Sequence, residues 1–204
     1  MGNIKETTKD DLLAFIQKLD YFIDQPVTII VLGGTALTLV DLKSSTRDID
    51  FIISSKDAQV LLKLFTVLGF KEIAERRWLT KDGIIIDIYL DDYIVNVKLL
   101  KPSITESTFL RAFEHITVRV LNYYDISITK IDRGDERDFE DIKHILEKTD
   151  TKIPVLIRKF IISMDLSESE NPKFKLLEFV KFITKVGYSL SKEDMRRIQE
   201  WQRT

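Results

Sequence analysis

Apolar side chains recur every three or four positions along much of the chain, which is the spacing of one face of an α-helix. In the first such stretch Leu12, Ile16 and Leu19 fall on one face, and the pattern ends before Pro26. The same spacing predicts helices over residues 7–22, 35–40, 123–133, 136–148, 155–164, 173–186 and 191–201.

Residues that favour helix ends support these assignments. A further helix is predicted to start with Ser55 as its N-cap and to end at Gly69. Asp135 is the expected N-cap of the helix over 136–148, and Ser191 with Asp194 has the spacing of a capping box.

Other stretches are short and rich in β-branched residues, which favours strands. They predict strands over residues 27–32, 48–54 and 115–121. Residues 76–80 and 84–90 predict a hairpin, because Asp82-Gly83 between them is the preferred chemistry of a tight two-residue loop.

The order of these elements predicts the fold class. Strands alternate with helices up to about residue 150, and only helices follow. We therefore expect an α/β (α+β) fold, with a mixed sheet flanked by helices in a domain over 1–150 and a small helical appendage over 151–204.

Composition excludes several classes of protein. The chain has 204 residues, of which 44% are hydrophobic and 31% are charged, as in a folded globular protein. It contains no cysteine, so a disulfide framework, a zinc-thiolate site and a cysteine nucleophile are excluded. Its apolar runs are shorter than the roughly 20 residues of a membrane span, and no secretory signal pattern stands at the start, so we expect a cytoplasmic protein without membrane contact.

Charge is distributed unevenly along the chain. Residues 151–204 carry 11 Lys and Arg against 7 Asp and Glu, whereas residues 1–150 have an acidic surplus. Arg196, Arg197 and Trp201 could contact a nucleic-acid backbone and a base, or they could form a solvated helix face with Trp201 on the core.

Two of the seven glycines stand side by side at Gly33-Gly34, between a predicted strand and a predicted helix. Glycine lets a backbone approach phosphate oxygens closely, and a helix start offers free N–H groups to them. A tight turn alone would also explain the pair. Neither a Walker loop nor a Rossmann fingerprint is present.

Two acids stand at the start of the predicted strand over 48–54. Because side chains alternate along a strand, Asp48 and Asp50 project from one face while Ile49 and Phe51 project from the other. Carboxylates about 7 Å apart can hold one or two hard cations, and Mg²⁺ prefers such oxygen ligands. Solvated edge charges are the alternative interpretation.

A third acid, Asp87, is a single charge on an otherwise apolar strand. A carboxylate in such a place is costly unless it lies at the surface, in an ion pair or on a metal. If this strand lies beside the one over 48–54, three carboxylates converge and could bind metal for phosphoryl-group chemistry.

Together these residues resemble a known superfamily. Residues 33–36, residues 46–50 and Asp87 are similar to the minimal nucleotidyltransferases of the DNA polymerase β-like superfamily. Residues 128–142, with a lysine followed by Arg-Asp-x-x-Asp, are similar to the signature of its AbiEii-like branch, which includes nucleotidyltransferase toxins. The resemblance spans roughly residues 26–148 and implies a polymerase β-like fold.

The resemblance implies roles for individual residues. Gly33, Gly34 and Thr35 would hold the triphosphate of an NTP with the help of Arg47. Asp48 and Asp50 would bind Mg²⁺ or Mn²⁺, with Asp87 as the third ligand or as the general base for the acceptor hydroxyl.

The second motif adds further implied roles: Lys130 would reach the phosphates, and Asp138 or Asp141 would position that lysine or the acceptor. An alternative from the residues alone is that Asp135 and Asp138 cap a helix and complement its dipole. The chain departs from the branch in having Thr35 where serine is usual and Ser44 where arginine is frequent.

These patterns lead to one principal hypothesis and two alternatives. The first is a Mg²⁺-dependent nucleotidyltransferase that moves an NMP from an NTP to a hydroxyl of RNA (such as a tRNA end), a protein or a small molecule, with a toxin-like role. The second is a non-catalytic binding module, an antitoxin or regulator that contacts a partner protein through its C-terminal helices. The third is a metal-dependent phosphohydrolase using the same three aspartates.

Overall fold

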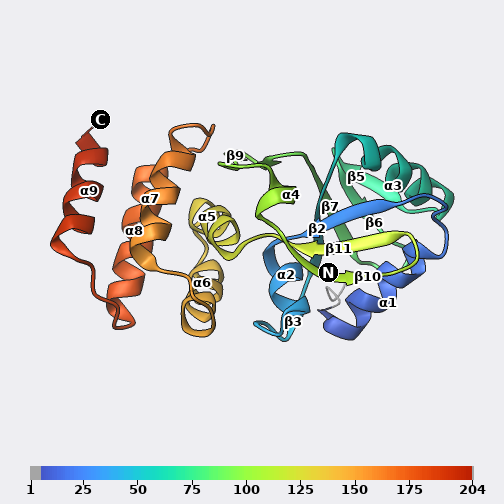
Figure 1. Ribbon diagram of the computed structural model, residues 1–204, viewed down its shortest axis with the longest axis horizontal. Coiled ribbons are helices and arrows are strands. Elements are labelled where there is room, and N and C mark those ends of the chain that lie inside the picture. Colours follow the sequence, from blue (N-terminus) through green and yellow to red (C-terminus); the bar gives the residue numbers. More distant parts are fainter. Residues whose placement is uncertain (1–5, 204) are drawn as a thin grey trace. The chain divides into compact units, whose positions relative to one another are not determined.

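All five predicted strands pair into one sheet in the computed structural model, which describes residues 6–203 (Figure 1). The sheet has seven strands, in the spatial order β10 (Thr108–Ala112), β11 (Ile116–Val120), β2 (Val27–Val31), β4 (Asp48–Ile53), β7 (Ile85–Leu90), β6 (Arg77–Leu79) and β5 (Lys71–Ala74). β11 is parallel to β2 and β4 is parallel to β7, whereas the remaining neighbours are antiparallel. The mixed α/β class predicted from the sequence is therefore confirmed.

The sheet belongs to the first of two compact units, which we call the sheet unit. It comprises the chain up to Ile94 together with Lys101–Asn122. Besides the sheet it contains helices α1 (Lys9–Asp20), α2 (Gly33–Leu39), α3 (Ser55–Val67) and α4 (Ser103–Glu106), and the short strands β1 (Thr7–Thr8), β3 (Ser45–Thr46) and β8 (Tyr93–Ile94).

Aromatic contacts show which face of the sheet α1 and α3 cover. Phe65 of α3 packs edge-on against Trp78 of β6, with ring centroids 5.6 Å apart, and against Phe70. Phe15 of α1 stacks on the same Phe70. Because side chains alternate along β6, the neighbour of Trp78, Arg77, points to the opposite face. That opposite face carries the candidate site.

Two local predictions need correction. The N-cap of α3 is Ser54, whose hydroxyl accepts from the N–H of Asp57, and Ser55 is the first helical residue. The β6–β7 hairpin does not have a two-residue loop, because Thr80 donates its N–H to the carbonyl of Ile84 and leaves three residues between them. Gly83, the third, has φ +81°, a left-handed conformation that suits a three-residue hairpin loop.

Strands β5 and β10 lie at the two edges of the sheet, and the apolar pattern did not predict them. The residues of β5 are all exposed, and four of the five residues of β10 are exposed. A strand without a buried face has no alternating apolar pattern to reveal it.

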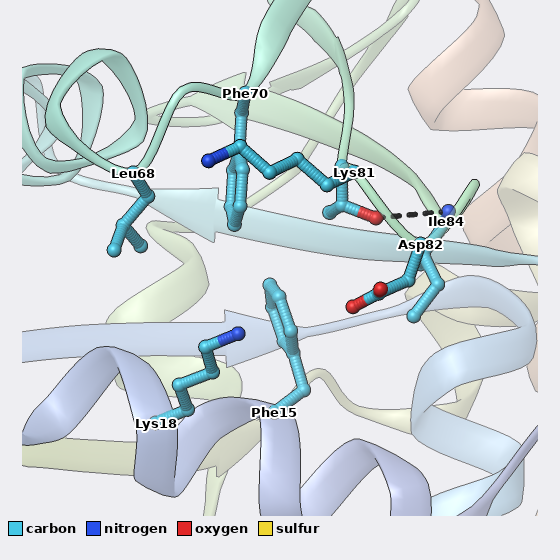
Figure 2. A pocket seen from close by; sticks show the side chains of 8 residues that line it. Phe15, Lys18, Leu68, Phe70, Lys81, Asp82 and Ile84 are labelled. Atoms are coloured by element: carbon cyan, nitrogen blue, oxygen red, sulfur yellow. Dashed lines mark hydrogen bonds between the residues drawn. The ribbon is translucent and has the colours of Figure 1, made fainter.

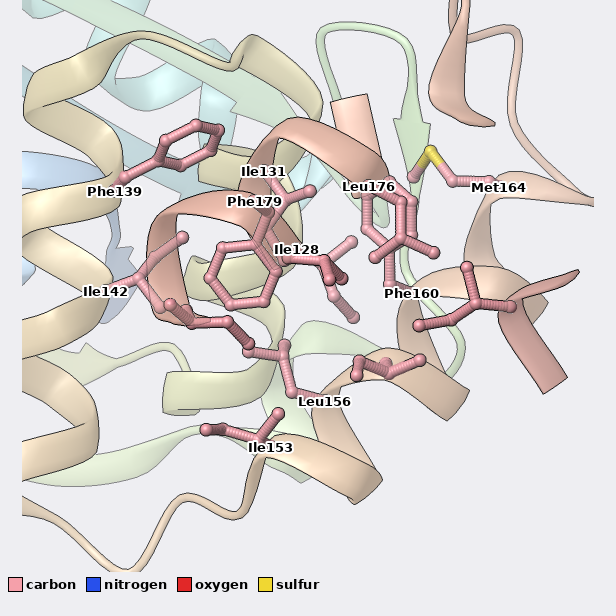
Figure 3. Close-up of a cluster of buried hydrophobic side chains, with 14 of the residues drawn as sticks. Ile128, Ile131, Phe139, Ile142, Ile153, Leu156, Phe160, Met164, Leu176 and Phe179 are labelled. Carbon is pink, nitrogen blue, oxygen red and sulfur yellow. The ribbon is translucent and has the colours of Figure 1, made fainter. Parts of the chain in front are cut away.

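The second unit, here called the helical unit, comprises Val95–Leu100 and the chain from Tyr123 onward. It contains α5 (Tyr123–Arg133), α6 (Glu136–Lys148), α7 (Ile153–Met164), α8 (Pro172–Lys185), α9 (Lys192–Arg203) and the short strand β9 (Val97–Lys98). Figure 3 shows its buried cluster, in which side chains of α5, α6, α7 and α8 pack together. The capping box of Ser191 and Asp194 is present at the start of α9.

The boundary between the units differs from the one expected at residue 150. Ile128 and Ile131 of α5 and Ile142 of α6 are fully buried in the same cluster as Phe160 of α7 and Phe179 of α8. The first two helices therefore share their core with the C-terminal helices. The apolar period of a helix shows that one of its faces is buried, but it does not show which other element that face packs against.

Trp201 is part of the same core. Its side chain is buried, packs edge-on against Phe160, and donates its indole N–H to Asp165 over 2.8 Å. With 8% of its surface exposed and its place in the core cluster, Trp201 is confirmed as a core residue rather than a stacking platform for a nucleobase. In the part of the chain that the structure describes, no helix combines the length and the apolar character that crossing a membrane requires.

One buried carboxylate ties the end of α1 to the β10–β11 turn. Asp20 accepts hydrogen bonds from the N–H groups of Glu114, His115 and Ile116, at 3.2, 2.9 and 2.6 Å. Burial by itself would raise the pKa of Asp20, but these donors stabilise its charged form and hold the pKa below the ordinary value of 3.8.

We expect Asp20→Ala to lower the free energy of unfolding by about 1–3 kcal/mol, because one buried N–H group, that of Ile116, and two part-buried ones lose their acceptor. The contribution of Asp20 is present above pH 3.8 and is lost as the pH falls through its depressed folded-state pKa. Urea denaturation of both proteins at several pH values checks this. An equal difference between the two proteins at pH 7 and well below the folded-state pKa would contradict it.

Candidate active site

The predicted alternation along β4 is confirmed. Ile49 and Phe51 are fully buried, whereas Asp48 and Asp50 are partly exposed on the other face. The buried side chains fix the orientation of the strand, since a shift of one residue would move the acids into the core.

The third carboxylate lies on the neighbouring strand. In the parallel pairing of β4 with β7, Asp50 stands directly opposite Asp87, and Asp48 stands opposite Ile85. Residues that face each other in register project from the same side of a sheet. Asp48, Asp50 and Asp87 therefore share one face, which we call the acidic face.

The first glycine of α2 is packed against this face. Gly33 has φ +57°, and a Cβ added there would lie 2.7 Å from a carboxylate oxygen of Asp50. A Cβ added to Gly34 would lie 2.5 Å from the hydroxyl oxygen of Thr46. Any larger residue at either position would have to displace these neighbours, so the two glycines allow α2 to begin beside Asp50.

Thr35 has a different place from the one expected. Its side chain is fully buried, and its hydroxyl donates to the carbonyl of Asp48 at 3.0 Å while accepting from the N–H of Asp50 at 2.9 Å. The single hydroxyl proton is thus used within the protein and is unavailable to a phosphate. Thr35 fixes the backbone between the two acids, and it does not present its side chain to a ligand.

Arg77 also belongs to the acidic face, although the sequence interpretation did not include it. It stands opposite Asp87 in the antiparallel pairing of β6 with β7. Its Nε lies 3.5 Å from Asp87 Oδ1, and its terminal nitrogen lies 4.0 Å from Asp48 Oδ2. The predicted hairpin already placed residues 76–80 beside the strand of Asp87, but counting back from its expected two-residue loop pairs Asp87 with Trp78, and only the observed three-residue loop gives Arg77.

Burial is the main influence on Asp87, whose side chain is 17% exposed. It raises the pKa of Asp87 from the ordinary value of 3.8, the positive charge of Arg77 opposes that rise, and the negative charge of Asp48 adds to it. A carboxyl with a raised pKa is better able to accept a proton than an ordinary one.

The acidic face offers the oxygen donors that Mg²⁺ or Mn²⁺ requires, and its three acids lie on adjacent strands. Their side chains nevertheless do not form a closed cluster: within residues 6–203 no group of three or more His, Asp or Glu side chains is gathered as a metal site. The type and face of the donors fit a divalent ion, and closure of the site requires side-chain movement. Arg47, between β3 and β4, directly precedes Asp48 in the chain and is exposed.

The residues of the second motif come together inside the helical unit. Lys130 donates to Asp138 at 3.0 Å and to Asp141 at 2.6 Å, and all three side chains are at least nine-tenths buried. Arg133, which is 62% exposed, also donates to Asp138. Burial by itself would raise the pKa of Asp138, but Arg133 and Lys130 lower it below its ordinary value.

This arrangement decides between the roles considered for these residues. The side chain of Asp138 makes ion pairs and does not cap its helix, and Asp135 occupies the N-cap position without a side-chain hydrogen bond. Asp138 and Asp141 both accept hydrogen bonds from Lys130, which is the contact that positioning of the lysine would need. Lys130 has a 2% exposed side chain and two carboxylate partners, an arrangement that favours a structural cation over a group that reaches phosphates.

Two hollows in the sheet unit lie away from the acidic face. Figure 2 shows one of about 180 Å³, where Phe15 and Lys18 of α1 lie near Phe70, Lys81 and Asp82. The other, of about 440 Å³, lies beside α3. Neither is lined by Asp48, Asp50 or Asp87.

Comparison with known proteins identifies the class. A family model described as "Nucleotidyltransferase of unknown function (DUF6036)" matches residues 10–193. The chain is thus an enzyme of the nucleotidyltransferase class. It belongs to the DUF6036 family, whose model covers both the sheet unit and most of the helical unit.

Two solved structures are similar to the chain, each with 16% identity. The crystal structure of ANT(2")-Ia in complex with adenylyl-2"-tobramycin matches with a TM-score of 0.48 over 73% of this chain and 92% of that one. The crystal structure of an antigenic nucleotidyltransferase-like protein from Paracoccidioides brasiliensis matches with a TM-score of 0.45 over 89% of this chain and 93% of that one. No curated protein matches the sequence.

The contact between Gly33 and Asp50 generates a stability prediction. We expect Gly33→Ala to lower the free energy of unfolding by about 2–4 kcal/mol, through a strained positive φ and a clash with Asp50. Gly83→Ala is the matched control, because Gly83 also has a positive φ but has nothing within 4 Å of the added Cβ. Equal losses in chemical denaturation of the two variants would show that the Asp50 contact has no effect.

The burial of Lys130 leads to a second prediction about stability. Lys130→Met leaves Asp141 without this cation and Asp138 with Arg133 alone, so we expect a loss of about 3–5 kcal/mol in unfolding free energy. Arg133→Gln, at a mostly exposed position, should cost about 1 kcal/mol or less. If thermal or urea unfolding ranks the two variants in the opposite order, the structural role of Lys130 is wrong.

Proposed function

We propose that this nucleotidyltransferase moves a nucleoside monophosphate from an NTP to an acceptor hydroxyl and releases pyrophosphate. The observation that carries the proposal is the register of β4 and β7, which gives Asp48, Asp50 and Asp87 one common face beside the start of α2. A single acid would be an ordinary surface charge, whereas three on adjacent strands form an oxygen-donor set.

Asp48 and Asp50 are the proposed holders of Mg²⁺ or Mn²⁺. A divalent ion bound there would neutralise phosphate charge and favour departure of pyrophosphate. The fixed backbone between the two acids, held by the Thr35 hydroxyl, keeps their spacing constant. Such fixed positioning supplies much of the catalysis in phosphoryl-group transfer.

Asp87 is proposed as a third ligand or as the base that accepts the proton of the acceptor hydroxyl. Its partly buried position and raised pKa suit the second role. For the triphosphate we propose Arg47 and the backbone at Gly33 and Gly34, where the absence of Cβ atoms permits close approach.

The proposal also names a class of acceptor for the nucleoside monophosphate. We propose an RNA hydroxyl, such as a tRNA end, with protein and small-molecule hydroxyls as alternatives that the experiment separates. Membership of the AbiEii-like branch, with a toxin-like role, is proposed from residues 128–142, whose lysine and two aspartates are joined by ion pairs. The exposed surface of α7–α9 is the proposed contact for the acceptor or a partner protein.

The decisive experiment incubates the protein with each α-labelled NTP, Mg²⁺ or Mn²⁺, and separate pools of tRNA, protein and small hydroxyl compounds. Label should appear on one pool, and Asp48→Asn or Asp50→Asn should lower the rate about a thousandfold, because a metal contributes several kcal/mol to such reactions. Asp82→Asn is the matched control, since Asp82 is an exposed acid in the β6–β7 turn where asparagine fits equally well.

Other outcomes have distinct meanings. Full activity of Asp50→Asn would show that the acidic face is not the catalytic site. Pyrophosphate or phosphate release without label on any pool would indicate a phosphohydrolase. NTP binding that is indifferent to metal, with no turnover, would indicate a binding module.

A further inference from the structure

Arg77 places a positive charge where the proposed function requires a metal ion. Its guanidinium lies beside Asp87 at 3.5 Å and within 4.0 Å of Asp48, so one side chain spans two strands of the acidic face. The antiparallel pairing of β6 with β7 sets this position, because Arg77 and Asp87 are direct cross-strand partners.

A divalent ion and this guanidinium compete for the same two carboxylates, each of which Arg77 contacts through one oxygen. A Mg²⁺ ligand oxygen lies about 2.1 Å from the ion, which is closer than any guanidinium contact. An ion held there would stand within a few ångströms of Arg77, and like charges at that separation repel strongly in a partly buried site. Arg77 therefore opposes binding of the metal as long as it stays beside Asp48 and Asp87.

The side chain of Arg77 has the means to leave. It is 42% exposed, and both its contacts are long for ion pairs, so the interaction that must be broken is weak. The backbone of Arg77 stays in the β6–β7 ladder while its flexible stem moves. At the same face, the planar fork of a guanidinium matches the oxygens of a phosphate.

We propose that Arg77 is a substrate-binding residue that exchanges partners when substrate binds. Without metal it partly offsets the negative charges of Asp48 and Asp87 and so reduces the repulsion between them. When the metal and NTP bind, the carboxylates pass to the metal and Arg77 passes to the triphosphate. This inference rests on the proposed function, because it assumes that the acidic face binds a metal–nucleotide pair.

The first consequence concerns metal binding without nucleotide. Removing the competing cation by Arg77→Gln should tighten Mn²⁺ binding by about five- to tenfold, a size expected for weak charge pairs at a partly exposed site. Arg76→Gln is the matched control: it removes the same charge one residue earlier, where Arg76 faces Glu75 at 3.7 Å. That variant should bind Mn²⁺ within about twofold of the wild type.

The second consequence concerns the nucleotide. At saturating Mn²⁺, Arg77→Gln should bind a non-hydrolysable NTP analogue about tenfold more weakly, because a charge-assisted contact to phosphate is lost. Arg77→Lys keeps the charge but loses the planar fork of the guanidinium, so its affinity for the analogue should lie between those of the wild type and Arg77→Gln. The expected signature is opposite in sign for the two ligands, which a general loss of folding would not produce.

Titration calorimetry of the full chain with Mn²⁺ alone, and then with the analogue, measures both effects. Unchanged Mn²⁺ affinity in Arg77→Gln would overturn the competition, and unchanged analogue affinity would overturn the transfer to phosphate. Asp50→Asn separates this inference from the proposed function. If that variant binds Mn²⁺ as tightly as the wild type, the acidic face is not the metal site and the proposed function itself is wrong.

Discussion

The parallel pairing of β4 with β7 is the constraint on which the site depends. It sets Asp50 opposite Asp87 and so brings like charges together, an arrangement that costs free energy unless a cation is present. The apolar residues on the other side of both strands prevent any change of register that would separate the acids. The packing of the core thus keeps the carboxylates of the acidic face close together, and Arg77 partly offsets the repulsion between them.

The start of α2 extends this constraint to the backbone. The Thr35 hydroxyl binds the backbone at both Asp48 and Asp50, and the missing side chain of Gly33 leaves room for the Asp50 carboxylate. Strand β4 is thereby held by β7 on one edge and by the first turn of α2 on one face. The acids project from a part of the fold that is fixed in several ways, while their tips remain partly exposed.

The sequence predicted the central strands, most helices and the common face of the three acids, because burial imposes a period that can be counted. It did not predict the edge strands β5 and β10, which have no buried face. It assigned Thr35 to a ligand and overlooked Arg77 for the same reason: residue type suggests chemistry, but only register and burial show which partner is within reach. The expected boundary at residue 150 also differs from the observed division at Tyr123, because α5 and α6 share a core with α7 and α8.

The segment Val95–Leu100 limits how the two units can be separated from each other. It lies between parts of the sheet unit in the chain but belongs to the helical unit, where Ser163 donates to the carbonyl of Lys98 and Lys98 donates to Ser167. The chain therefore passes between the units three times. A helical fragment that begins at residue 123 would leave Ser163 and Ser167 without their partners at Lys98. A chain divided at any single point therefore leaves at least one of the two units incomplete.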